Sequence, residues 1–156
     1  MIVLMILTIM DKNLKKTAEP WVIKSNLNEK EFLNTVNDIE IQNNLFILDG
    51  EKMKNWDSLF KEFQNVMNFP SYCEPNKDSF DECIMDLPEW LSSQIYIIFI
   101  KNSDKLLINE VDYKDEYEEL IENFNEYAEE YSEELFYDEG NVNNRKAYPF
   151  HIILGN

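Results

Sequence analysis

The sequence contains few of the residues from which most catalytic and metal sites are built. Its 156 residues include three glycines, two cysteines and a single histidine. Three glycines cannot supply a glycine-rich phosphate loop, and no Gly-x-Ser-x-Gly segment marks a serine nucleophile. Cys73 and Cys83 lack the Cys-x-x-Cys spacing of zinc ligands, and His151 lies far along the chain. We therefore expect no metal site and no cofactor, and we expect the two cysteines to be free thiols.

Positive charge is the second shortage. Fourteen Lys and Arg residues stand against 31 Asp and Glu residues, which gives a formal net charge of −17. Nucleic-acid binders neutralise phosphates with a basic face, and anionic membranes attract basic segments, so both partner classes are excluded. Almost all of the excess negative charge lies after residue 44, because residues 1–44 have a net charge of only −1. Such a surface favours a basic partner.

The sequence has no hydrophobic run long enough to span a bilayer, which takes about 20 residues. Residues 1–10 are largely apolar, but they lack the basic start and the small-residue cleavage site of a secretory signal. We expect them to form a buried strand, or else to precede a true start at Met10. The protein is therefore expected to be soluble and cytoplasmic.

The hydrophobic pattern alternates between strands and helices. Three segments have the pattern of buried strands: 45–48, 95–100 and 150–154. Three segments repeat apolar residues at the 3.6-residue helical period: 53–67, 80–87 and 113–135. The run Ile95–Ile100 is apolar on both faces, which is typical of the central strand of a parallel sheet. The order of elements predicts an α/β fold, with a three-stranded parallel sheet packed against helices.

The first 44 residues predict an added β-α segment. Residues 21–24 have a short strand pattern, and Asn28 with Glu31 marks the start of a helix that continues to about Ile39. We treat 1–44 as an N-terminal extension that extends the sheet beside Leu45–Leu48.

Two features of the acidic part of the chain could carry a function. Asp78 and Glu82 lie one helical turn apart and share a face. Crowded carboxylates can serve acid–base chemistry because one pKa rises, but no other catalytic group accompanies the pair, and a solvated helix face explains it too. The second feature is residues 110–139, with 14 acidic residues and one lysine. Glutamates four residues apart, such as Glu126 and Glu130, destabilise a helix by about 0.2–0.5 kcal/mol, so this face favours a cationic partner.

A motif lies after Leu48-Asp49-Gly50 and the helix that follows it. Its members are Pro70, Tyr72, Asn76, Asp78, Phe80, Asp86, Leu87 and Trp90. Their spacing resembles that of the barstar family, small intracellular inhibitors of secreted bacterial ribonucleases. The resemblance covers 45–156 and implies a barstar-like domain there that is not an enzyme.

In that family a loop and the helix after it plug the ribonuclease active site, and acidic side chains take the place of RNA phosphates. Carried over by position, the resemblance implies six partner-binding residues: Tyr72, Asn76, Asp78, Glu82, Asp86 and Glu126. It also implies an immunity protein or antitoxin. The implied partner is a cognate basic nuclease toxin, bound one to one by a chain that is monomeric when free and touches neither nucleic acid nor membrane.

The sequence departs from the family pattern inside the loop. Glu74 stands at the motif glycine and Pro75 follows it, so a turn with φ > 0 is costly there. Lys77 and Ser79 also differ from the pattern, and Glu82 is one methylene longer than the usual aspartate. These differences imply a partner other than the family's best-known ribonuclease.

Two other functions stay open at this point. The chain could be an acidic mimic of nucleic acid that sequesters a non-toxin basic DNA- or RNA-binding protein. It could also be an enzyme that uses the Asp78/Glu82 carboxylate pair.

Overall fold

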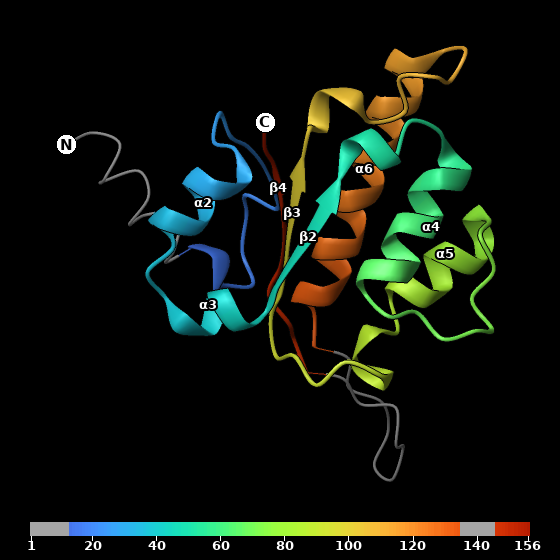
Figure 1. The fold of residues 1–156 in the computed structure, drawn as a ribbon. Helices are drawn as coiled ribbons and strands as arrows, with labels where there is room; N and C mark the ends of the chain where they lie inside the picture. Colours follow the sequence, from blue (N-terminus) through green and yellow to red (C-terminus); the bar gives the residue numbers. More distant parts are fainter. Residues whose placement is uncertain (1–12, 135–145) are drawn as a thin grey trace, which may run out of the picture.

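The structure, a computed structural model, describes residues 13–134 and 146–156, which form a parallel sheet between two layers of helices (Figure 1). The sheet has the order β1-β4-β3-β2, with β1 (Val22–Lys24), β2 (Leu45–Asp49), β3 (Tyr96–Lys101) and β4 (Phe150–Leu154). One layer holds α2 (Glu29–Thr35) and α3 (Ile39–Asn43). The other holds α4 (Trp56–Val66), α5 (Lys77–Ile84) and α6 (Tyr113–Ser132).

The strand β3 lies inside the sheet, as its sequence predicts. It pairs in parallel with β2 on one side and β4 on the other, and its residues Tyr96 to Ile100 are fully buried. Helices cover both faces of this strand, so six consecutive apolar residues from Ile95 find apolar surroundings. The predicted α/β class and the parallel strands near 45–49, 95–101 and 150–154 are confirmed.

The N-terminal strand is the main difference from the prediction. It adds a fourth strand, and it pairs with β4, with Val22 opposite Ile152, instead of extending the sheet beside Leu45–Leu48. Connections between parallel strands are right-handed, so a β1 beside β2 would place α2 and α3 in the same layer as α4–α6. With β1 at the far edge, the same handedness places α2 and α3 on the other face. The prediction of a position beside β2 was therefore wrong.

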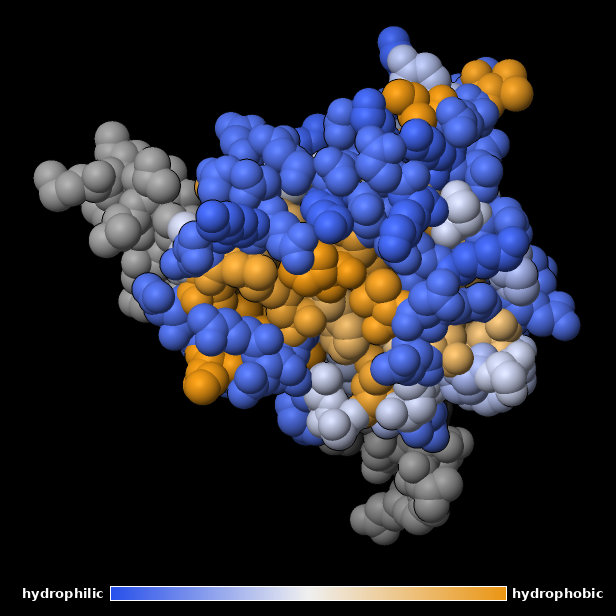
Figure 2. Space-filling view, viewed as in Figure 1, coloured by the Kyte–Doolittle hydropathy of each residue, from blue (hydrophilic) through white to orange (hydrophobic). Residues whose placement is uncertain are grey.

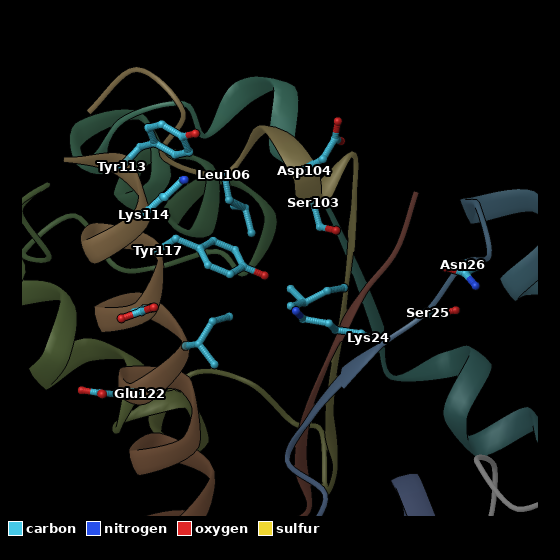
Figure 3. A pocket seen from close by; sticks show the side chains of 13 residues that line it. Lys24, Ser25, Asn26, Ser103, Asp104, Leu106, Tyr113, Lys114, Tyr117 and Glu122 are labelled. Carbon is cyan, nitrogen blue, oxygen red and sulfur yellow. The ribbon is translucent and has the colours of Figure 1, made fainter. Parts of the chain in front are cut away.

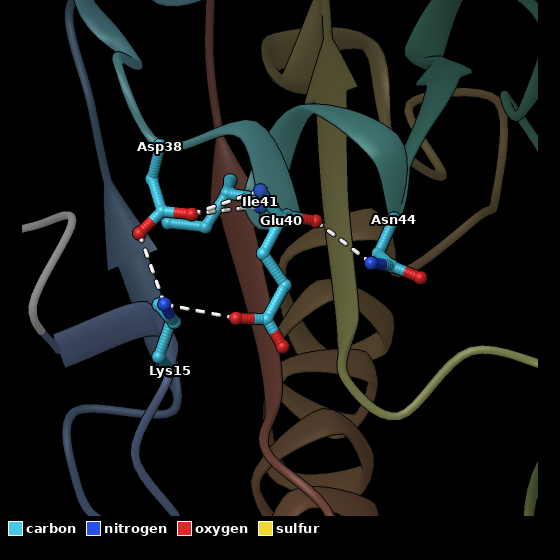
Figure 4. Close-up of polar contacts among 5 residues, drawn as sticks. All are labelled: Lys15, Asp38, Glu40, Ile41 and Asn44. Carbon is cyan, nitrogen blue, oxygen red and sulfur yellow. Dashed lines mark hydrogen bonds and ion pairs between the residues drawn. The ribbon is translucent and has the colours of Figure 1, made fainter.

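The helix predicted from Asn28 to about Ile39 is shorter than predicted: α2 ends at Thr35, and a separate helix, α3, begins at Ile39. Asn28 caps α2 as predicted, accepting a hydrogen bond from the Glu31 amide at 2.9 Å. The chain then leaves the helix at Val36, and the Asp38 side chain caps α3 by accepting from the amides of Glu40 and Ile41 (Figure 4). A second capping residue inside the helical pattern explains the break, because capping side chains compete with helix continuation.

Three further contacts hold α3 in place (Figure 4). The Lys15 ammonium lies 3.1 Å from the Asp38 carboxylate and 2.8 Å from that of Glu40, and Asn44 donates to the Glu40 carbonyl at the end of the helix. These partly exposed ion pairs tie the start of the described chain to α3.

The other edge of the sheet is β2. Leu45, Phe46 and Ile47 are only partly buried there. Figure 2 shows apolar surface between the two helix layers, where Figure 1 places this strand. The turn Asp49-Gly50 ends β2 as predicted, and a Cβ at Gly50 would lie 2.0 Å from the Asn102 carbonyl oxygen, so only glycine fits there.

His151 lies in β4 and is fully buried, which agrees with its interpretation as a packed histidine. Its Nδ1 is 2.9 Å from the Pro20 carbonyl oxygen and its Nε2 is 2.8 Å from that of Lys16. Burial lowers the pKa of His151 and outweighs the two carbonyl contacts, which raise it. The lowered pKa favours the neutral ring near neutral pH, in which one of the two nitrogens carries the proton and donates to its carbonyl.

We expect His151 to make folding stability fall as the pH falls. Because its pKa is lower in the folded than in the unfolded chain, the unfolded state binds more protons near pH 6. The contribution of His151 to folding stability is complete above its pKa in the unfolded chain, about 6.5. It is lost as the pH falls from there toward the lower pKa of the folded state. Urea unfolding at pH 7 and pH 5 should show a larger loss for the parent than for His151→Phe. Equal losses would contradict this assignment, since both proteins carry the same carboxylates.

Within the described ranges, no helix is both long and apolar enough to cross a membrane. The strand or alternative start expected within residues 1–10 lies outside the described residues, as does Leu135 at the end of the last predicted helix.

Candidate functional site

The loop between α4 and α5 displays Tyr72 while its own start is anchored in the core. Helix α4 ends at Val66 with Met67 as its C-cap, and Asn68 turns the chain with a left-handed φ of 53°. The Phe69 ring then packs against Trp90, with centroids 5.5 Å apart, and stacks on Phe80 at 6.0 Å. Tyr72 follows with 68% of its surface exposed. The loop thus presents one large aromatic side chain to solvent.

Helix α5 begins with a cap made by the predicted site residue Asn76. Its side-chain oxygen accepts from the Ser79 amide at 2.9 Å, and the Ser79 hydroxyl accepts from the Glu74 amide at 2.8 Å. Asn76 therefore has a structural role in the free protein. Asp78 is exposed in the first turn, where the positive end of the helix dipole stabilises its carboxylate.

Cys73 and Cys83 form a disulfide, so the prediction of free thiols was wrong. Helix α5 runs back beside the loop and brings the two Cα atoms to 6.3 Å, although ten positions separate the residues in sequence. No spacing rule reveals this pair because the proximity arises from the path of the chain. Among the described residues other than glycine, positive φ occurs at Asn68, Asn102 and Leu107. Glu74 therefore follows this loop without the φ > 0 turn.

Several acidic residues of α5, α6 and the turn after α5 line one hollow of about 490 Å³. It is lined by Asp81, Glu82, Met85, Asp86, Glu126, Tyr127 and Glu130. Three of the six predicted site residues, Glu82, Asp86 and Glu126, come together here. The other three, Tyr72, Asn76 and Asp78, lie in the loop and at the start of α5.

Two polar contacts join α5 to α6, and one of them lies between two residues that line this hollow. The Tyr127 hydroxyl donates to the Asp81 carboxylate, and the Lys77 ammonium pairs with the Glu119 carboxylate. Burial raises the pKa of Tyr127, and the Asp81 carboxylate raises it further. The hydrogen bond to Glu119 raises the pKa of Lys77. Tyr127 therefore stays protonated and supplies a donor within a group of carboxylates.

The far end of α5 is fixed by Tyr131 of α6. Its hydroxyl donates to the Ile84 carbonyl at 2.6 Å and accepts from the Leu87 amide at 3.2 Å. The ring stacks on Phe150 with centroids 5.3 Å apart. The helix that carries Asp78 and Glu82 is therefore held at both ends.

Sequence reasoning missed Asp81 and Glu130 as members of the acidic hollow. The sequence could have identified both residues, because Asp81 directly precedes Glu82 and Glu130 lies one helical turn after Glu126. Across the described part of the chain, no three His, Cys, Asp or Glu side chains are close enough to hold a metal ion. The hollow gathers five carboxylates on its lining without bringing three of them into such a cluster.

A second hollow, of about 810 Å³, lies between β1, β4 and α6. Tyr117 of α6 and Lys24 of β1 point into it from opposite sides (Figure 3). Its lining mixes both signs of charge, including Lys114 and Glu118, and none of the six predicted site residues lines it. A basic partner is therefore better matched by the hollow between α5 and α6.

One comparison with known proteins identifies a family. A family model described as Barstar (barnase inhibitor) matches residues 43–142. The matched range contains β2, α4, α5, β3 and α6, together with all six predicted site residues. A search of the curated proteins found no match.

Proposed function

The chain belongs to the barstar family of barnase inhibitors, which are not enzymes, and we propose that it binds one cognate toxic ribonuclease and blocks its active-site cleft. The observation that carries the proposal is the acidic surface of α5 and α6, where Glu82, Asp86 and Glu126 share one hollow. Tyr72 and Asp78 extend this surface along the loop and the start of α5.

The mechanism is competition with the RNA backbone. A ribonuclease cleft binds a polyanion and is therefore basic, so the net charge of −17 steers the two proteins together. Carboxylates on α5 and α6 then pair with the cations that would otherwise hold phosphates. In this proposal Tyr72 covers the cleft beside them, since exposed aromatic side chains commonly anchor protein interfaces.

The proposed binding residues all lie in 45–156, and we propose that residues 13–44, the described part of the N-terminal extension, serve the fold. Phe32 of α2 stacks on Phe99 of β3 with centroids 4.6 Å apart, and β1 completes the sheet beside β4. Both contacts lie on elements away from α5 and its loop. Helices α2 and α3 thus cover the face of the sheet opposite the acidic helices.

The test is inhibition of purified ribonucleases by the purified chain. Barnase and any nuclease encoded beside this gene should be assayed with a fluorogenic RNA substrate. We expect stoichiometric loss of cleavage for the cognate enzyme at one inhibitor per enzyme. Full cleavage with every ribonuclease tested, together with tight capture of a DNA-binding protein, would instead support the nucleic-acid-mimic hypothesis.

We expect the association rate with that ribonuclease to fall steeply with added salt. Counter-ions screen charge within about 8 Å at physiological ionic strength, so long-range steering weakens while the close contacts persist. Stopped-flow mixing at increasing sodium chloride measures this, and light scattering gives the mass of the free chain, expected to be monomeric. A salt-independent association rate or a stable homo-oligomer would contradict the steering mechanism.

A further inference from the structure

The disulfide between Cys73 and Cys83 encloses the proposed binding motif. Cys73 directly follows Tyr72, and Cys83 directly follows Glu82. The covalent loop closed between them contains Asn76 and Asp78. The crosslink therefore joins the two ends of the segment that carries most of the proposed contacts.

Within this loop, the Asn76 and Ser79 cap and the Lys77–Glu119 ion pair hold the start of α5, while the contacts nearest Tyr72 are made by Cys73. The Cys73 amide donates to the Pro70 carbonyl at 3.0 Å, and Gln64 donates to the Cys73 carbonyl at 2.6 Å. Residues 74 to 78 are all exposed, and Tyr72 is 68% exposed. By contrast, Cys73 and Cys83 are only 6% and 4% exposed. The residue next to Tyr72 is thus tied to the protein by two hydrogen bonds of its backbone and by the disulfide to α5.

We infer that the Cys73–Cys83 disulfide positions the binding loop and makes binding of the ribonuclease sensitive to redox conditions. This inference rests on the proposed function. With the disulfide intact, Tyr72 and Asp78 are held relative to Glu82 before the partner arrives. After reduction, the loop must be ordered during binding, and ordering opposes affinity.

A dithiol reduces the Cys73–Cys83 disulfide by thiol–disulfide exchange. Its two thiols give up two protons and two electrons and close into a disulfide. The Sγ–Sγ bond between Cys73 and Cys83 breaks, and each sulfur receives one proton. The protein gains two hydrogen atoms, one on each sulfur, and loses no atom.

Reduction is expected to raise the dissociation constant about tenfold, the scale for ordering one or two loop residues on binding. Linkage then requires the reciprocal effect: bound ribonuclease makes the disulfide about tenfold harder to reduce. For a two-electron couple, tenfold corresponds to about 30 mV in the reduction potential.

The experiment first uses the free protein, with and without dithiothreitol. Amide hydrogen exchange over residues 72–78 should become about tenfold faster on reduction, while exchange in β3 and α6 stays slow. The matched control is Cys73→Ser/Cys83→Ser, which should exchange like the reduced parent with or without dithiothreitol. Unchanged exchange in the reduced parent would overturn the positioning role, whatever the partner.

The second measurement is the dissociation constant of each form for the ribonuclease that the chain inhibits. We expect the oxidised parent to bind tightly. The reduced parent and the double serine variant should both bind about tenfold more weakly. Equal affinities of all forms would refute redox sensitivity and leave the proposed function intact. If no form inhibits barnase or the neighbouring nuclease, the proposed function fails, and hydrogen exchange alone decides the positioning role.

Discussion

Replacing Asp78 or Glu82 by alanine is expected to weaken ribonuclease binding by about 2–5 kcal/mol each, mostly through faster dissociation. In the proposed complex each carboxylate pairs with a cation that the interface removes from water. Removing the carboxylate leaves that cation buried without a partner, which costs more than the pair itself contributes. Asp78 and Glu82 are both exposed in the free protein, so neither substitution removes packing from the core.

Surface plasmon resonance at fixed ionic strength separates the two rate constants of these variants. Glu31→Ala is the matched control, because it removes the same charge from α2 on the opposite layer. It should alter mainly the association rate, as should Glu133→Ala at the end of α6. Thermal unfolding should confirm that stability changes stay within about 0.5 kcal/mol. If Asp78→Ala and Glu82→Ala dissociate as slowly as the parent, the partner docks elsewhere.

Much of the fold could be predicted because local patterns agree with the tertiary arrangement. The run Ile95–Ile100 allows only a strand covered on both faces, and it is an interior strand of the sheet. The position of β1 could not be predicted in the same way. Strand pairing depends on the handedness of a connection across the whole sheet, and the three residues Val22–Lys24 carry no such information.

The candidate site also has a part that the sequence predicts and a part that it does not. The acidic face of α5 follows from helical spacing, so Asp78 and Glu82 were identifiable from sequence. The meeting of Glu82 with Glu126 depends on how α6 packs against α5. The disulfide depends on the path of the loop, which brings Cys73 back to α5. Contacts between elements need tertiary structure, and contacts within an element do not.

The acidic helix depends on Phe80, which connects it to the core. This ring is 3% exposed and lies on the inner face of α5. Its centroid is 5.0 Å from that of Phe60 and 5.1 Å from that of Phe63, both on α4, and 6.2 Å from that of Tyr127 on α6. One side chain therefore joins the loop, α4, α5 and α6.

Phe80→Ala is expected to lower the free energy of unfolding by about 3–5 kcal/mol, because the lost ring leaves a cavity that these packed neighbours only partly fill. That is a large share of the roughly 5–15 kcal/mol that stabilises a typical domain. Urea unfolding followed by far-UV circular dichroism measures the change, and Phe80→Leu, which keeps more of the volume, should cost less. The substitution leaves every carboxylate of the acidic surface in place. A loss below about 1 kcal/mol would show that α5 is held by its disulfide and polar contacts, and not by this aromatic cluster.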